Sequence, residues 1–244
     1  MQPTKKAAEM TERELARYID QSVLKPEFTV GEIRRWAQEG IDFGCATVCI
    51  NPASLPVVAP MVEGTGTGLC VVCDFPFGLA TTEAKAALAE TYCSRWDIED
   101  LDIVANYGRL RSGDLGFVVA DLRPVVEACH RHGTLVKVII ETDFLTPGQV
   151  ADGTRCAIEA GAGFIKSSTG FATGVEPLGA TAEVAAKMIE AAEGRIKVKG
   201  SGGIRTREHF LDLIDMGIDR MGVGYRSTPV VLGMSAEEAR GLAG

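Results

Sequence analysis

Residues 135–167 read LVKVIIETDFLTPGQVADGTRCAIEAGAGFIKS, and this stretch changes its apolar pattern twice. Its two ends, 135–141 and 163–167, are short β-branched apolar runs that are typical of buried strands. Between them, Pro147 fits the first turn of a helix and Gly161 fits its end. The stretch therefore predicts a strand, a helix and a second strand that runs parallel to the first.

The same alternation recurs along the whole chain without a linker or a shift in composition. Eight strands are expected, over 18–22, 46–50, 69–75, 101–105, 135–141, 163–167, 196–200 and 220–223. Capping signals mark the helices: the pairs Thr11/Glu14, Thr29/Glu32, Thr146/Gln149 and Ser235/Glu238, the N-caps Thr81 and Thr206, and the glycines Gly133, Gly161, Gly194 and Gly217. Eight such repeats with almost wholly apolar strands predict an α/β fold, a single-domain (β/α)8 TIM barrel over 11–244. Residues 1–10 are expected to form a flexible N-terminal tail.

A doubly wound open sheet is the competing fold. Such a sheet usually carries a glycine-rich nucleotide-binding turn after its first strand. The run Gly64-Thr-Gly-Thr-Gly68 precedes a predicted strand instead, so we interpret it as a flexible turn.

Composition excludes several classes of protein. The 244 residues are 46% hydrophobic, enough for a sizeable core, and their net charge of −8 gives no general attraction to nucleic acid or anionic membranes. Apolar runs stay short of the roughly 18 residues that a membrane span needs, and the first ten residues lack the apolar centre of a secretory signal. Glycine is enriched, at 28 residues. We expect a cytoplasmic protein without nucleic-acid or membrane partners.

Seven cysteines are too many by one to pair fully within the chain, which favours free thiols in the cytoplasm. Cys70 and Cys73 have the spacing of a redox or zinc pair, but strand alternation places them on opposite faces. They are better explained as small buried apolar residues. The three histidines have no ligand spacing, and no metal is expected.

Charged residues interrupt four of the apolar strands. They are Asp102, Lys137, Lys166 and Lys199. A strand lysine can simply point outward and keep its ammonium in water, and Lys197 shares its parity with Lys199. Three strands with lysines that end in polar or glycine-rich loops favour function instead, because lysines are rarely buried without a purpose. In a barrel, such residues gather at the carboxyl ends of the strands.

A cluster of amines and a carboxylate predicts imine chemistry without a metal or organic cofactor. A lysine amine becomes nucleophilic when a second ammonium and partial desolvation favour its neutral form. The neutral amine then attacks a carbonyl carbon and forms a Schiff base. Asp102 and a second lysine could relay the protons that these steps require.

Glycine-rich turns follow the last three strands. They are Thr169-Gly170, Ser201-Gly-Gly203 and Gly222-Val-Gly224. Loops after the last two strands of a barrel often hold phosphate on backbone N–H groups, which predicts a phosphate site here. The alternative is that these glycines only permit tight turns.

Several segments, taken in order, resemble the deoxyribose-phosphate aldolases, class I aldolases with a (β/α)8 barrel. The matching segments are IDQSVLKP (19–26), VCINP (48–52), FPFG (75–78) with TTEAK (81–85), LDIV (101–104), RSGD (111–114), LVKVIIET (135–142), FIKSSTGF (164–171) and VKGSGGIRT (198–206). They span about residues 19–224.

The resemblance implies a role for each matching residue. Lys166 would form the Schiff base, and Asp102 and Lys199 would form the proton-relay pair, with Lys199 favouring the neutral amine of Lys166. The implied reaction joins acetaldehyde, as its enamine, to glyceraldehyde 3-phosphate, and cells usually run the reverse cleavage of 2-deoxyribose 5-phosphate. Further matches line the substrate pocket (Asp20, Ser22, Cys49, Lys137 and Thr169) or the phosphate turns (Gly170, Gly202 and Gly203).

The chain departs from the family pattern at the phosphate end. The last strand leads into Gly222-Val-Gly-Tyr-Arg-Ser-Thr-Pro229, where a Gly-Thr-Ser stretch is typical. Tyr225 is bulky there, whereas Arg226, with Gly224, could replace the hydroxyls by a charged fork for phosphate or carboxylate, or point outward. The first strand motif has Gln21-Ser22 where the family usually has His or another residue followed by Thr. The loop over 172–179 is longer than the usual family loop beside the same pocket.

Three functions therefore stay open. The first is deoxyribose-phosphate aldolase. The second is a sibling aldolase with the same enamine chemistry and a different acceptor aldehyde, either phosphorylated or unphosphorylated. The third is a non-catalytic sugar-phosphate-binding barrel. A homodimer or a higher homo-oligomer also stays open.

Overall fold

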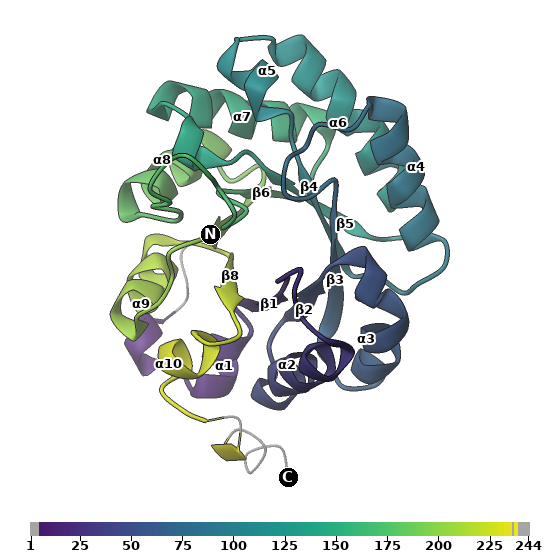
Figure 1. Cartoon of the computed structure of the whole chain (residues 1–244). Coiled ribbons are helices and arrows are strands. Elements are labelled where there is room, and N and C mark those ends of the chain that lie inside the picture. The colour runs from purple at the N-terminus through teal and green to yellow at the C-terminus, as the bar shows by residue number, and fades with distance from the viewer. Residues whose placement is uncertain (1–4, 236, 239–244) are drawn as a thin grey trace.

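Eight parallel strands close into a barrel in chain order, and the helices surround it (Figure 1). The computed structural model describes residues 5–235, 237 and 238. The strands are β1 (Ile19–Val23), β2 (Thr47–Ile50), β3 (Gly68–Cys73), β4 (Asp100–Val104), β5 (Leu135–Ile139), β6 (Phe164–Lys166), β7 (Lys197–Ser201) and β8 (Arg220–Gly224). Each predicted strand overlaps an observed one, so the TIM barrel is confirmed and the open-sheet alternative is wrong.

The helices alternate with the strands as predicted. They are α1 (Glu12–Ala16), α2 (Val30–Phe43), α3 (Leu55–Val62), α4 (Thr82–Cys93), α5 (Tyr107–Arg111), α6 (Leu115–His130), α7 (Pro147–Ala160), α8 (Ala182–Ala192), α9 (Arg207–Met216) and α10 (Thr228–Leu232). Three short 3₁₀ turns add η1 (Ala7–Glu9), η2 (Pro52–Ser54) and η3 (Thr142–Phe144).

Most of the predicted capping signals are confirmed. Thr11, Thr29 and Thr146 each form a full capping box at the start of a helix. Gly161 and Gly217 end α7 and α9 in the left-handed region, whereas Gly133 and Gly194 lie beyond the C-caps of α6 and α8. Ser235 and Glu238 exchange both capping hydrogen bonds, and the rest of any helix there lies outside the described residues.

Strand register decides which side chains enter the barrel. Asp102 lies beside Lys137, Lys166 beside Lys199, and Ser22 beside Gly224. Alternate residues face inward, while the others pack against the helices and form the main apolar core, to which Val48, Val71, Leu101, Val138 and Ile165 belong. Cys73 belongs to this outer core and Cys70 to a separate inner cluster, which confirms their opposite faces.

Residues 5–10 pack against the barrel. Ala7 is buried, and its backbone N–H donates a hydrogen bond to Asp215 of α9 at 2.8 Å. The division into a flexible tail and a domain at residue 10 stays a prediction, because residues 1–4 lie outside the described part of the chain. Within that part, none of the helices combines the length and the apolar character that crossing a bilayer requires.

Candidate active site

Asp102 joins two lysine amines inside the barrel. Its Oδ2 accepts hydrogen bonds from Lys166 Nζ at 2.8 Å and from Lys199 Nζ at 2.7 Å. The three residues come from β4, β6 and β7, and all three are buried. Lys166 is the last residue of β6, so its amine lies at the carboxyl-terminal mouth of the barrel, where parallel barrels carry their chemistry.

Further charged side chains form ion pairs with this group inside the barrel. Asp20 contacts Lys199 Nζ at 2.5 Å, Arg220 at 2.7 Å and Lys137 Nζ at 3.4 Å. Lys137 also pairs with Asp100 and lies 3.4 Å from Asp102. Asp20 and Lys137, which the sequence predicted to line the substrate pocket, are therefore fully buried partners of the catalytic candidates.

Counting the charges singles out one lysine. Four cations (Lys137, Lys166, Lys199 and Arg220) face three carboxylates (Asp20, Asp100 and Asp102). In the described part of the chain Lys166 contacts one of these carboxylates, Lys199 two and Lys137 three, so Lys166 has the fewest carboxylate partners of the three lysines.

The pKa directions agree with this assignment. Burial opposes charge on Lys199, but Asp102 and Asp20 outweigh it and raise the pKa of its ammonium. Burial likewise opposes charge on Asp102, whereas Lys166, Lys199 and Lys137 hold the pKa of this carboxyl well below its ordinary value. Asp102 therefore stays an anion and Lys199 a cation, ready to position or exchange protons beside Lys166.

The predicted phosphate turns gather at the same mouth. Gly170, Gly202 and Gly203 all have a left-handed φ, and a Cβ on Gly203 would lie 2.6 Å from the carbonyl oxygen of Leu178. Part of this glycine requirement therefore comes from the loop over 172–179, which packs on the turn after β7. Ser22 and Gly224 are register neighbours that face the mouth, from β1 and β8.

Tyr225 does not narrow the pocket. Its ring is buried outside the barrel, 4.3 Å from the Trp36 ring and 5.2 Å from the Phe28 ring between centroids. Arg226 is exposed, and its guanidinium lies 5.3 Å from the centroid of that outward ring. The structure does not bring Arg226 to the lysines, and its role in substrate binding stays a prediction.

Sequence reasoning missed four residues of the site. Asp100 precedes the predicted strand by one residue, yet it shares parity with Asp102, and Arg220 shares parity with Gly222. Cys70 donates a hydrogen bond to Asp102 Oδ1 at 3.3 Å. The alternation of side chains along these two strands could therefore have predicted that Asp100 and Arg220 face the barrel interior.

Glu141, the fourth missed residue, lies buried at the end of β5. Its left-handed backbone ends the strand, and its carboxylate accepts hydrogen bonds from the backbone N–H and the hydroxyl of Thr169. Burial raises the pKa of Glu141, although both hydrogen bonds from Thr169 oppose the shift. The Thr169 hydroxyl is thus already bound within the protein.

Comparisons with known proteins give the family. The chain is 38% identical over 219 residues to the deoxyribose-phosphate aldolase of Micrococcus luteus, covering 87% of this chain and 93% of that protein. It is 41% identical over 208 residues to deoxyribose-phosphate aldolase 2 of Bacillus licheniformis, covering 85% and 91%. The chain belongs to the deoxyribose-phosphate aldolase family. No protein-family model matches it.

Solved structures agree with this family membership. An aldolase called QR15 superposes with a TM-score of 0.81 at 34% identity, covering 94% of this chain and 98% of that one. A tetrameric deoxyribose phosphate aldolase from Aeropyrum pernix gives a TM-score of 0.81 at 26% identity, covering 91% of each. The resemblance predicted from the sequence is therefore confirmed.

One donor set in this deoxyribose-phosphate aldolase chain has metal-ligating chemistry. Atoms of Cys49, Cys70 and Asp102 lie within 4.8 Å of one another. Burial, and then the hydrogen bond with Cys49, raises the pKa of the Cys70 thiol well above its ordinary value. A cation would have to displace a thiol proton and compete with three ammonium groups for Asp102, which disfavours metal binding by this set.

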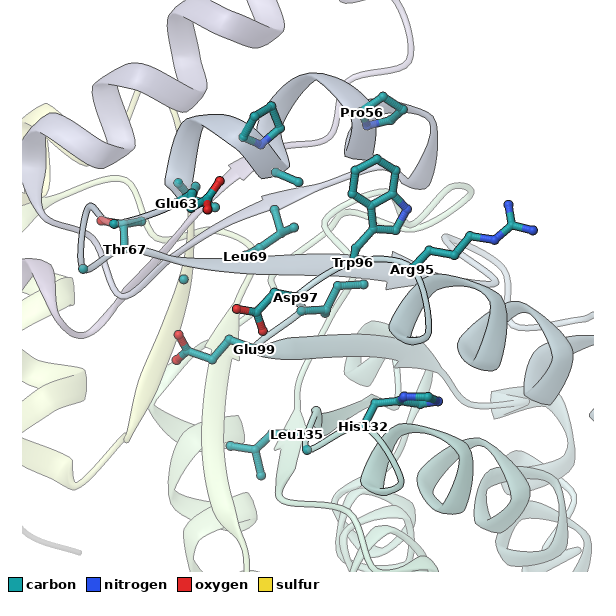
Figure 2. Close-up of a pocket in the computed structure, with 18 residues that line it drawn as sticks. Pro56, Glu63, Thr67, Leu69, Arg95, Trp96, Asp97, Glu99, His132 and Leu135 are labelled. Carbon is teal, nitrogen blue, oxygen red and sulfur yellow. The ribbon is translucent and has the colours of Figure 1, made fainter.

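A large cavity of about 890 Å³ lies at the other end of the barrel from Lys166. Figure 2 shows Leu69 of β3, Glu99 before β4 and Leu135 of β5 around it, with Trp96 on its edge. These are amino-terminal ends of strands, whereas family chemistry is expected at the carboxyl ends. The cavity is therefore separate from the candidate active site.

Proposed function

We infer that the chain is a class I aldolase that reversibly cleaves 2-deoxy-D-ribose 5-phosphate to acetaldehyde and D-glyceraldehyde 3-phosphate. The observation that carries this function is Asp102, whose one oxygen holds both Lys166 and Lys199 in a buried site. Membership of the deoxyribose-phosphate aldolase family supports the same carbon–carbon lyase reaction.

Imine formation starts on Lys166. Its neutral amine attacks the aldehyde carbon of the open-chain sugar, and the carbonyl oxygen takes a proton. The resulting carbinolamine then loses water and becomes an imine. Asp102 and Lys199 exchange protons with these groups, because Asp102 accepts a hydrogen bond from the reacting nitrogen at 2.8 Å and from Lys199 at 2.7 Å.

Cleavage uses the imine as an electron sink. Removal of the proton from the C3 hydroxyl breaks the bond between C2 and C3, which releases glyceraldehyde 3-phosphate and leaves an enamine on Lys166. Protonation of the enamine at C2 restores an imine, and water releases acetaldehyde. No metal or organic cofactor enters these steps.

The remaining residues would hold the substrate or the catalytic group. Ser22 and Cys49 face the mouth, and the turns with Gly170, Gly202 and Gly224 would offer backbone N–H groups to the phosphate. Asp20 and Lys137 are fully buried, so they would act through Lys199 and Asp102.

A cleavage assay tests the proposal. We expect purified protein to convert deoxyribose 5-phosphate to equal amounts of both aldehydes, and Lys166→Leu to lose at least about a thousandfold in kcat. Lys197→Leu provides the control, since this exposed lysine lies on the neighbouring strand and should retain activity. Cleavage that survives Lys166→Leu would contradict the mechanism.

The two alternatives are separated in the same assay. A sibling aldolase would cleave deoxyribose as well as its phosphate, and the contact of the exposed Arg226 with the Tyr225 ring favours testing this. A binding protein without activity would cleave neither. A homo-oligomer, which the tetrameric relative supports, and a cytoplasmic location complete the proposal; sedimentation velocity tests the first.

A further inference from the structure

A small apolar cluster lies at the carboxyl-terminal mouth, separate from the main core. We call it the mouth cluster; its buried members are Leu24, Cys49, Cys70 and Val72, and the half-exposed rings of Phe75 and Phe171 pack on them. These residues come from β2 and β3 and from the segments directly after β1, β3 and β6. They therefore form an apolar wall on one side of the site.

The mouth cluster begins next to the reacting amine. Cys70 donates to Asp102 Oδ1 at 3.3 Å, while the other oxygen of that carboxylate holds Lys166 at 2.8 Å. A substrate joined to Lys166 and extending past Cys70 therefore meets apolar side chains.

Two loops bring the aromatic rings together. Phe75 follows β3 and Phe171 follows β6, and their rings meet edge to face with centroids 5.4 Å apart and an interplanar angle of 82°. The N–H of Phe171 donates to the Thr169 hydroxyl at 2.9 Å, and that hydroxyl is bound to Glu141. These hydrogen bonds fix the backbone at Phe171, and its ring packs against Phe75.

Two cations in the loops beside the mouth cluster, Lys25 and Arg226, have contacts with other residues. Lys25, directly after Leu24, is exposed and lies 3.7 Å from Glu27. Arg226 lies over the outward ring of Tyr225. The described contacts of both side chains thus leave the Phe75–Phe171 side of the mouth with aromatic rather than cationic chemistry.

We propose that Phe75 and Phe171 determine acceptor specificity and that the site takes acceptor aldehydes with apolar substituents. This rests on the proposed aldolase function. In the addition direction the enamine carbon on Lys166 forms a bond with the acceptor carbonyl carbon, and the carbonyl oxygen takes a proton. Water then hydrolyses the imine, which frees the hydroxyaldehyde and restores the lysine. The aromatic pair binds the apolar substituent during the bond-forming step.

The test compares two acceptors with acetaldehyde as donor. The probes are 3-phenylpropanal and glyceraldehyde 3-phosphate, and kcat/KM is measured for wild type, Phe171→Ala and Phe171→Leu. We expect Phe171→Ala to lower the ratio of kcat/KM for the first acceptor over the second by about tenfold, as loss of a hydrophobic contact does in other pockets. Phe171→Leu should recover part of it. Phe117→Ala, a half-buried phenylalanine on α6 beside Arg109, is the control.

A fall in the ratio of less than about threefold in Phe171→Ala overturns the inference. Borohydride trapping of the acetaldehyde imine accompanies each measurement. Trapping that persists while the ratio stays unchanged defeats the specificity inference alone, whereas absence of trapping in wild type defeats the proposed function. If Phe171→Ala does not fold, Phe171→Leu carries the same comparison.

Discussion

Lys166 differs from the other buried lysines in how few carboxylates hold it. Lys85, buried outside the barrel, contacts Asp121 at 2.6 Å and Asp74 at 3.6 Å, and Lys199 likewise contacts two carboxylates. Lys166 shares its single ion-pair partner among these carboxylates, Asp102, with both Lys199 and Lys137. Burial alone therefore does not distinguish Lys166 from the other buried lysines, whereas the number of carboxylate partners does.

Removing the charge of Lys199 should make Lys166 harder to deprotonate. In Lys199→Leu, Asp102 would lose one of its three ammonium partners, so the ammonium of Lys166 would be better compensated. We expect imine formation to slow by at least about tenfold at neutral pH, and the rising limb of the pH–rate profile to move to higher pH. Stopped-flow kinetics between pH 6 and 10 measures both, with Lys197→Leu as control; an unchanged profile would count against the coupling.

Asp20 should matter for stability as well as for chemistry. It contacts Lys199, Lys137 and Arg220, and Thr47 donates to it at 2.8 Å. Asp20→Asn leaves these cations with less compensation inside the barrel, so we expect a loss of about 3–5 kcal/mol in the free energy of unfolding. Urea denaturation measures it. Asp212→Asn, at an exposed position of α9, should change it by less than about 0.5 kcal/mol; equal effects in the two variants would refute the role of Asp20.

At the scale of elements, strand and helix positions were predictable because local signals and tertiary packing agree. Period, β-branching and capping residues all predict the same alternation of strands and helices, and the register then follows from closure of the barrel. The direction in which a single side chain points beyond the end of a strand was harder to predict from the sequence. Tyr225 faces outward because β8 keeps its alternation past Gly224, and the rings of Trp36 and Phe28 that receive it lie far away in sequence.

The site was only partly predictable for a related reason. The three lysines and Asp102 interrupt apolar strands, so they could be recognised, whereas Asp100 lies one residue before its predicted strand and Arg220 is the first residue of its strand. Glu141 was hidden because its left-handed backbone ends β5 and redirects its side chain toward Thr169. Local sequence carries no signal for that contact.

Two helical glycines should respond oppositely to alanine. A Cβ on Gly153 of α7 would lie 2.9 Å from Leu110 and 3.0 Å from Ile140, whereas one on Gly116 of α6 would meet nothing within 4 Å. We expect Gly153→Ala to cost about 1–3 kcal/mol through overpacking and Gly116→Ala to add about 0.4–1 kcal/mol by restricting the unfolded chain. Thermal unfolding of both variants tests this, and a gain in Gly153→Ala would show that the contact yields easily.

For the whole molecule, net charge conceals the local balance. The chain carries −8, yet the charged side chains of the barrel interior balance to within one charge. Much of the glycine enrichment lies at helix ends and in turns, and the rest lies in the loops at the carboxyl-terminal mouth of the barrel.

Acid should unfold the protein through the barrel carboxylates. Despite burial, neighbouring cations lower the pKa of Asp20 and Asp102 in the folded state, so their contribution to stability is complete above the unfolded value of about 3.9 and is lost as the pH falls below it. We expect the free energy of unfolding to decline below about pH 4, and less steeply in Asp20→Asn. Urea titrations between pH 6 and 2 measure this; identical slopes would exclude Asp20.

Mapping the reduced acetaldehyde adduct tests the central claim most directly. Protein is incubated with acetaldehyde, reduced with borohydride, digested and sequenced by mass spectrometry. We expect an N-ethyl group on Lys166, and none on Lys137 or Lys199, whose ammonium groups are held by two or more carboxylates. An adduct on either of those lysines in place of Lys166, or no adduct at all, would contradict the assignment of the nucleophile.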